Sequence, residues 1–297
     1  MAKTVIVSED WAAIVAVREP KEHFDTCSLF NSAHDDSCTS PIDQFIENTL
    51  GINKLWATND SVENLGPEIG ILLLLGYVSA VESYMRALVR RLVFCDLFSQ
   101  ECCEKLQLSY GAALHHKADV LPEALLEETV FSGKAEITKA LEKFVGVKLN
   151  NKSIGELLDQ YELVCQLRHC CVHRFGKLGA KNAIALGLKS HKEFLEKPVL
   201  LNKSSIESIA DLLFVLVKSI NNEVFRLVME RSVKSKLQGS DQLGIGWNWH
   251  KTKDKKLYQS YYSVFASYKD AQPSPSSEEL YERFRKAHHK VGKRSNQ

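Results

Sequence analysis

The residues best suited to chemistry lie in one stretch of the chain, residues 165–174, with the sequence Cys-Gln-Leu-Arg-His-Cys-Cys-Val-His-Arg. Its Arg168 stays charged and can hold a phosphate group through paired hydrogen bonds. Histidine, whose ordinary pKa of about 6.5 lies nearest neutrality, can accept or donate a proton, and His173 follows five residues later. Because such groups are costly to bury unless they are paired or used, we take this stretch as the candidate functional site.

A metal site is an alternative chemistry for the same stretch. Cys165, His169 and His173 are spaced four residues apart, so they share one helical face and could hold zinc. Zinc needs a fourth ligand, however, and no second helix offers an H-x-x-x-H or C-x-x-C pair. The sequence also lacks a phosphate-binding G-x-x-x-x-G-K-[ST] loop and a G-x-S-x-G nucleophile motif. We therefore expect no metal and no cofactor.

The elements that position these residues are helices. Apolar residues recur at three- and four-residue spacing, and no alternating strand pattern occurs between residues 67 and 230. Ser153 and Glu156 form a capping-box pattern at the start of the helix that carries the polar stretch. The sequence predicts an all-α bundle of four to five helices. The expected helices are 67–94, 100–108, 134–145, 153–175 and 206–228.

The chain divides into three expected parts. Residues 1–65 are predicted to be an irregular N-terminal appendage, with a short strand at 4–7 and one or two helical turns at 11–17. Residues 66–232 are expected to form the bundle, and residues 233–297 a basic, aromatic C-terminal extension that ends in a helix.

Composition and charge are those of an ordinary globular protein. Of the 297 residues, 44% are hydrophobic, and 38 basic side chains face 37 acidic ones, which excludes disordered and collagen-like chains. Basic residues outnumber acidic ones by 14 to 6 in residues 231–297, so a polyanion would bind there. The uncharged run 69–81 is too short to span a bilayer, and no C-x-x-C motif or signal peptide is evident. We expect a cytoplasmic protein that does not enter a membrane.

Two features together resemble the HEPN superfamily of ribonucleases. The first is Arg168-x4-His173, with the polar His169 directly after the arginine, near the end of a late helix. The second is the early helix containing Gly76-Tyr-Val-Ser-Ala-Val-Glu-Ser-Tyr-Met-Arg86. The resemblance covers about residues 66–230. It implies a metal-independent endoribonuclease, a homodimer formed through the motif-bearing helix, and a role as a toxin or an effector of defence against phage. It also leaves room for an antitoxin or other regulatory partner.

The motif itself is weak evidence, since the chain contains it three times. Arg18/His23 spans a proline, and Arg283/His288 lies in an exposed basic helix. Only Arg168/His173 lies in a long helix with an apolar face and a second such helix upstream.

The resemblance assigns roles to several side chains. Arg168 is expected to hold the phosphate and His173 to take the proton of the ribose 2′-hydroxyl, which leaves a 2′,3′-cyclic phosphate. His169 is expected to position the substrate or relay a proton. Glu82, paired with Arg86 one turn later on the early helix, is expected to orient the motif side chains.

RNA is the expected partner, and two regions are predicted to bind it. Arg86, Arg174 and Lys177 lie near the motif in the predicted bundle. A second, basic-aromatic region could stack bases and neutralise phosphates, or else consist of aromatic rings docked on the bundle and lysines in solvent; it comprises Trp247, Trp249, Lys251 and Lys253. Two other functions stay open: a non-catalytic HEPN-like module that binds RNA, nucleotide or a partner protein, and an interaction protein that uses the C-terminal part.

Overall fold

The chain forms two units. The computed structural model describes residues 11, 12, 14, 15, 17, 24–57, 66–115 and 121–294. The first unit, Met1–Cys38, contains one short 3-10 helix, Cys27–Leu29, in its described part. The second, Thr39–Gln297, is a helical body that contains the candidate site. The boundary therefore lies at residue 38, whereas the sequence predicted it at residue 65.

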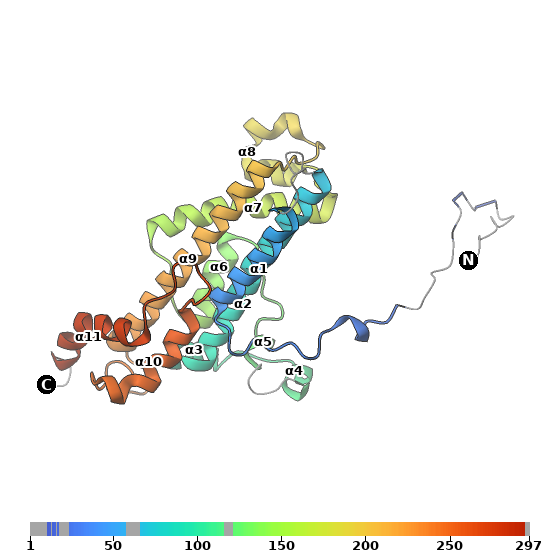
Figure 1. Cartoon of the computed structure of the whole chain (residues 1–297). Helices are drawn as coiled ribbons and strands as arrows, with labels where there is room; N and C mark the ends of the chain where they lie inside the picture. The colour runs from blue at the N-terminus through green and yellow to red at the C-terminus, as the bar shows by residue number, and fades with distance from the viewer. Residues whose placement is uncertain are drawn as a thin grey trace. The chain divides into compact units, whose positions relative to one another are not determined.

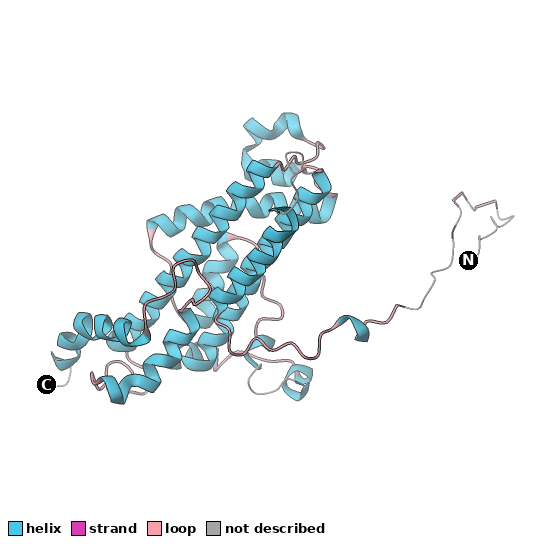
Figure 2. Ribbon diagram, viewed as in Figure 1, coloured by secondary structure: helices cyan, strands magenta, loops and turns pink. Residues whose placement is uncertain are grey.

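The described part of the second unit is helical apart from loops and two isolated β-bridges, which confirms the all-α class (Figures 1 and 2). The helices are α1 (Pro41–Ala57), α2 (Pro67–Cys95), α3 (Leu97–Cys103), α4 (Tyr110–His115), α5 (Leu121–Ala124), α6 (Lys134–Ala140), the π-helical turn η3 (Leu141–Val145), α7 (Lys152–Arg174), α8 (Ala180–His191), the 3-10 turn η4 (Lys192–Phe194), α9 (Lys203–Lys234), α10 (Lys251–Phe265) and α11 (Ser277–Arg294).

Helix α2 lies at the centre of the unit and contacts α1, α7, α9 and α10. Pro67 begins it, where a missing N–H costs no helical hydrogen bond. Leu74, Val81 and Leu88 are wholly buried. Among the described helices, α2 alone is long and apolar enough to cross a membrane by length and composition, and 61% of its apolar window is buried inside the protein, as in a core helix.

Helix α1 was not predicted, because the sequence analysis assigned residues 1–65 to an appendage. It packs along α2, and its Ile42, Phe45 and Ile46 are buried. Its apolar residues continue to Trp56 in the last turn, so the helical pattern was present in the sequence and was missed. The predicted strand at 4–7 lies outside the described residues, and those described between 11 and 17 are turn or irregular.

Residues 233–297 belong to the same compact unit as the bundle, and the boundary predicted at 232/233 falls inside α9. Helices α10 and α11 pack against each other and against α9. Buried aromatic rings from both helices, among them Tyr258, Tyr281 and Phe284, join the main core. The C-terminal segment is therefore part of the body.

Local capping differs from the sequence prediction in one place. Helix α7 is capped by Asn151, whose side-chain oxygen accepts hydrogen bonds from the backbone N–H groups of Ser153 and Ile154. The predicted capping box at Ser153 lies two residues too late, because asparagine caps a helix as well as serine does.

Candidate functional site at the end of helix α7

The last two turns of α7 change from core to surface. Tyr161, Val164 and Cys165 are buried on the inner face. Arg168 and His169, one turn later, are half-buried, and His173 is exposed. Since α7 packs on both α2 and α9, its inner residues fix the helix while its end presents the polar side chains to solvent.

Arg168 faces a carboxylate from another helix. Its guanidinium Nη2 lies 3.8 Å from Glu82 Oε1 of α2, and the two side chains are 28% and 27% exposed. Glu82 Oε1 is buried and accepts no hydrogen bond from the described residues. A buried carboxylate oxygen without a donor is costly, so the nearby guanidinium charge is its main compensation. Residues 86 positions apart in the chain thus meet at the candidate site.

The predicted pairing of Glu82 with Arg86 is not the one in the structure. Arg86 Nη1 donates to the Leu126 carbonyl at 2.7 Å and Nη2 to the Thr129 carbonyl at 2.7 Å. Its ion pair is with Glu123, at 3.2 Å. Arg86 therefore fixes the 123–129 segment onto α2, and the prediction that it binds RNA is not supported. The pairing could not be predicted locally, because its partners lie about 40 residues away.

The two histidines lie side by side. The rings of His169 and His173 have centroids 6.3 Å apart, as expected for residues one turn apart. Burial lowers the pKa of His169, and the positive charge of the adjacent Arg168 lowers it further. His169 is therefore held as neutral imidazole at neutral pH, the form that accepts a proton or hydrogen bond.

The zinc alternative requires Cys165 as a ligand. Burial raises the pKa of the Cys165 thiol to about 12, and the side chain points into the core beside Tyr161. The Tyr161 hydroxyl in turn donates to the Phe131 carbonyl at 2.9 Å. Across the described residues, no three His, Cys, Asp or Glu side chains are grouped closely enough to hold a metal ion.

The other two cations near the motif have different surroundings. Arg174 forms an ion pair with Glu196 at 2.5 Å and so holds the loop after α8 against the end of α7. Lys177 is exposed and forms an isolated β-bridge with Pro198 through its backbone. Of these two side chains, Lys177 is the better placed to contact a phosphate.

The predicted basic-aromatic surface is mostly core. Trp247 is 8% exposed, its Nε1 donates to Ser232 Oγ at 3.0 Å, and its ring lies 5.1 Å from that of Phe284. Trp249 is half-buried against Phe284, with centroids 5.7 Å apart. The prediction that these rings stack on bases is therefore wrong for Trp247, which is enclosed by protein.

The two lysines of that region do lie in solvent. Lys251 is exposed and paired with Glu278 at 2.6 Å, and Lys253 is exposed. The structure of this segment therefore matches the second of the two predictions, in which the aromatic rings dock on the bundle and the lysines lie in solvent.

Sequence reasoning missed two exposed apolar side chains at the end of α7. Val172 and Phe175 are 48% and 76% exposed. Phe175 ends α7 in a left-handed conformation, with φ of 51°. Leu163, 46% exposed, lies nine residues before Val172 and therefore on the opposite side of the helix.

Known proteins add no constraint on the site. No protein-family model, curated protein or solved structure matches the chain.

Proposed function

We propose that the protein is a metal-independent endoribonuclease of HEPN type, with its active site at the end of α7. The observation that carries the proposal is the grouping at this site. Arg168 lies beside Glu82 of α2, the half-buried His169 follows it directly, and His173 is exposed one turn later, with the two imidazole rings 6.3 Å apart. A cation for phosphate and an imidazole for proton transfer are the two groups that this reaction requires.

The reaction needs no nucleophile from the protein. The His173 imidazole takes the proton from a ribose 2′-hydroxyl, and the resulting oxyanion attacks the adjacent phosphorus. The bond to the 5′-oxygen breaks, that oxygen takes a proton from solvent water, and the His173 imidazolium returns its proton to the solvent. Arg168 neutralises the charge that builds on the non-bridging oxygens. The products are a 2′,3′-cyclic phosphate and a free 5′-hydroxyl.

Glu82 acts in this scheme as a positioning residue. Arginine has a long, flexible side chain, and a fixed carboxylate limits the directions in which its guanidinium can point. The Arg168 side chain stays 28% exposed, so one edge of the guanidinium is accessible to substrate while the other faces Glu82.

Pairing of two chains along α7 would complete the site. At about 100° per residue, an offset of five places Arg168 and His173 about 140° apart around one helix. A single helix therefore separates the two groups, and a second copy related by a two-fold axis could bring its own histidine opposite Arg168. The exposed Val172 and Phe175 supply apolar area for that contact.

The test is cleavage of labelled RNA by the purified chain in excess EDTA, with DNA of the same sequence alongside. We expect RNA fragments that end in 2′,3′-cyclic phosphate, intact DNA, and loss of cleavage in Arg168→Ala. RNA binding without cleavage would instead favour the non-catalytic alternative. A role as a toxin or defence effector, and the cytoplasmic location, rest on the resemblance and the composition alone.

A further inference from the structure

A large pocket lies away from the α7 site, between α1, α9 and the loop that follows α10. Its volume is about 1100 Å³, at the upper end of the range for small-molecule sites. None of its lining residues belongs to α7. We infer that this pocket binds an uncharged nucleoside, an inference that does not depend on the proposed ribonuclease activity.

The loop that lines the pocket is held to the rest of the unit by hydrogen bonds. Asp43, at the start of α1, accepts hydrogen bonds from the Ser267 hydroxyl at 2.6 Å and from the Tyr268 backbone N–H at 3.0 Å. At the ends of the loop, Asn221 donates to the Phe265 carbonyl and Tyr262 to the Pro275 carbonyl, each at 2.9 Å. Because the loop is fixed at both ends and in its middle, binding costs little ordering of the protein.

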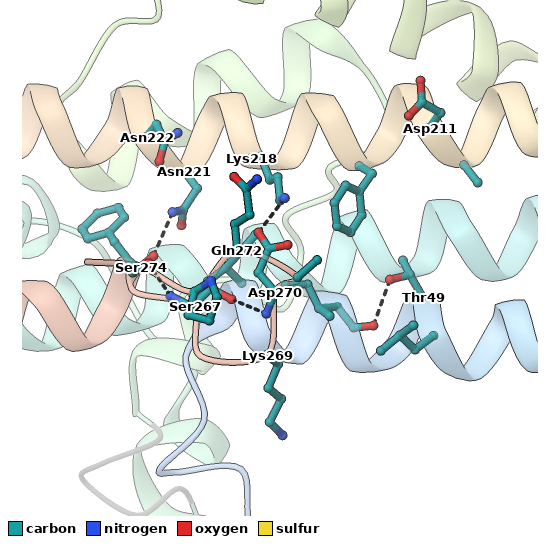
Figure 3. A pocket seen from close by; sticks show the side chains of 18 of the residues that line it. Thr49, Asp211, Lys218, Asn221, Asn222, Ser267, Lys269, Asp270, Gln272 and Ser274 are labelled. Carbon is teal, nitrogen blue, oxygen red and sulfur yellow. Dashed lines mark hydrogen bonds and ion pairs between the residues drawn. The ribbon is translucent and has the colours of Figure 1, made fainter. Parts of the chain in front are cut away.

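The charges that line the pocket cancel. Lys218 of α9 and Asp270 of the loop form an ion pair at 2.5 Å, visible in Figure 3 as the contact that joins the loop to α9. Lys269 pairs with Glu47 and points away from α9 in the same view. Asp211 is directed away from the loop. A phosphate would therefore meet no unpaired lysine in this part of the described chain and would lie near a carboxylate, so a neutral ligand is favoured.

Amide groups supply the hydrogen bonds. The Gln272 side chain extends from the loop toward α9 (Figure 3), and the described residues give its amide no hydrogen bond. Asn53 accepts from the Tyr77 hydroxyl through its oxygen, which leaves its NH₂ group available on the α1 side. Side-chain amides carry both donors and acceptors, and this combination matches the edges of nucleobases.

The remaining surfaces fit the other parts of a nucleoside. Leu50, 49% exposed, and the half-buried Phe214 supply apolar surface that can contact the faces of a base, above the buried Ile42 and Ile46. The Asp270 carboxylate, 13% exposed, can accept hydrogen bonds from ribose hydroxyls as acidic residues do in dinucleotide sites. The pocket thus has groups that fit a base and a ribose, and its paired charges favour a ligand that is itself uncharged.

The experiment is isothermal titration of the full chain with adenosine, guanosine, cytidine and uridine, and with their 5′-monophosphates. We expect at least one nucleoside to bind, and its 5′-monophosphate to bind about tenfold more weakly. Gln272→Ala should weaken nucleoside binding about tenfold, the usual effect of losing one hydrogen bond in a site. Ala210→Trp, which fills the pocket, should abolish it.

The matched control is Gln259→Ala, an exposed glutamine on α10 outside the pocket, which should leave affinity unchanged. Melting temperatures of all variants establish that each is folded. The inference is overturned if no nucleoside binds at millimolar concentration, if the monophosphate binds more tightly, or if folded Ala210→Trp and Gln272→Ala bind as the unmodified chain does. Because RNA cleavage is not measured, these outcomes are separate from those for the α7 site.

Discussion

The end of α7 and the segment 247–284 were both predicted to contact RNA, yet their side chains have different surroundings in the structure. In the C-terminal segment, Trp247 donates to Ser232 and packs on Phe284, and Lys251 pairs with Glu278. Most of the side chains that were predicted to bind RNA there have partners within the chain. At the end of α7, His173 is exposed, and the partner of Arg168 lies at 3.8 Å, beyond hydrogen-bond distance.

The comparison shows that residue type alone does not distinguish a stabilising cluster from a reactive one. Aromatic rings with nearby lysines occur both in base-stacking surfaces and in ordinary cores with solvated rims. What differs is whether the polar atoms are satisfied internally. On that criterion the α7 cluster is the stronger functional candidate of the two regions.

The largest effect we expect concerns the stability of the C-terminal segment. Trp247→Ala should lower the free energy of unfolding by about 3 to 5 kcal/mol, because it removes a buried aromatic side chain and its hydrogen bond. Denaturant titration measures this change. At a temperature where the variant is folded, its affinity for RNA should match that of the unmodified chain. A large loss of RNA affinity with unchanged stability would instead indicate that Trp247 contacts RNA.

Arg86 is predicted to stabilise the fold without taking part in cleavage. Arg86→Ala should cost about 2 to 3 kcal/mol of unfolding free energy, because two carbonyls of the 123–129 segment lose a charged donor. Chemical denaturation gives the value, and the cleavage rate of the folded variant should change little. If stability were unchanged while cleavage failed, Arg86 would belong to the active site.

The sequence predicted the helical class and the three long helices α2, α7 and α9 because their apolar spacing is strong over many turns. It also placed Arg168 and His173 near the end of a long helix, where they lie on α7, while their joint catalytic role stays a prediction. It could not assign partners that are distant in the chain, such as Glu82 to Arg168 or Glu123 to Arg86.

Two further features were missed. Helix α1 has apolar residues along its whole length and could have been predicted, but it directly follows the polar, loop-like stretch 23–41. The large pocket is built from three segments, around residues 42–53, 210–222 and 265–275, whose meeting depends on the tertiary fold.

Glu82 tests the link between α2 and the α7 cluster. Glu82→Gln keeps the shape of the side chain and removes its charge, so Arg168 should be less well positioned and cleavage about tenfold slower. Unfolding free energy should change by less than about 1 kcal/mol, since the pair is partly exposed. Single-turnover kinetics measure the first effect and denaturant titration the second. The control Glu278→Gln, which removes the charge of a solvent-exposed pair, should cleave normally; equal rates in both variants would argue against a positioning role.

The smallest effect is the pH dependence of stability due to His169. Its pKa is lowered in the folded chain, so below about pH 6.5 the unfolded chain binds the proton more readily and stability is lost as pH falls. The melting temperature should therefore drop more between pH 7.5 and 5.5 in the unmodified chain than in His169→Gln. His288, whose pKa is also lowered, contributes equally to both and cancels in the difference. If the melting temperature dropped equally in both chains, the pKa of His169 would not be lowered by folding.

The most direct test uses the two Arg-x4-His pairs that lie in described helices. Single-turnover cleavage of RNA in EDTA is compared for His173→Ala on α7 and His288→Ala on α11. The His288 ring packs on Phe284, and the arginine of that motif, Arg283, is paired with Glu279. The proposed mechanism predicts a loss of about 10² to 10⁴ in rate for His173→Ala and a rate within about twofold of the unmodified chain for His288→Ala. Equal rates for the two variants would contradict the assignment of the active site to α7.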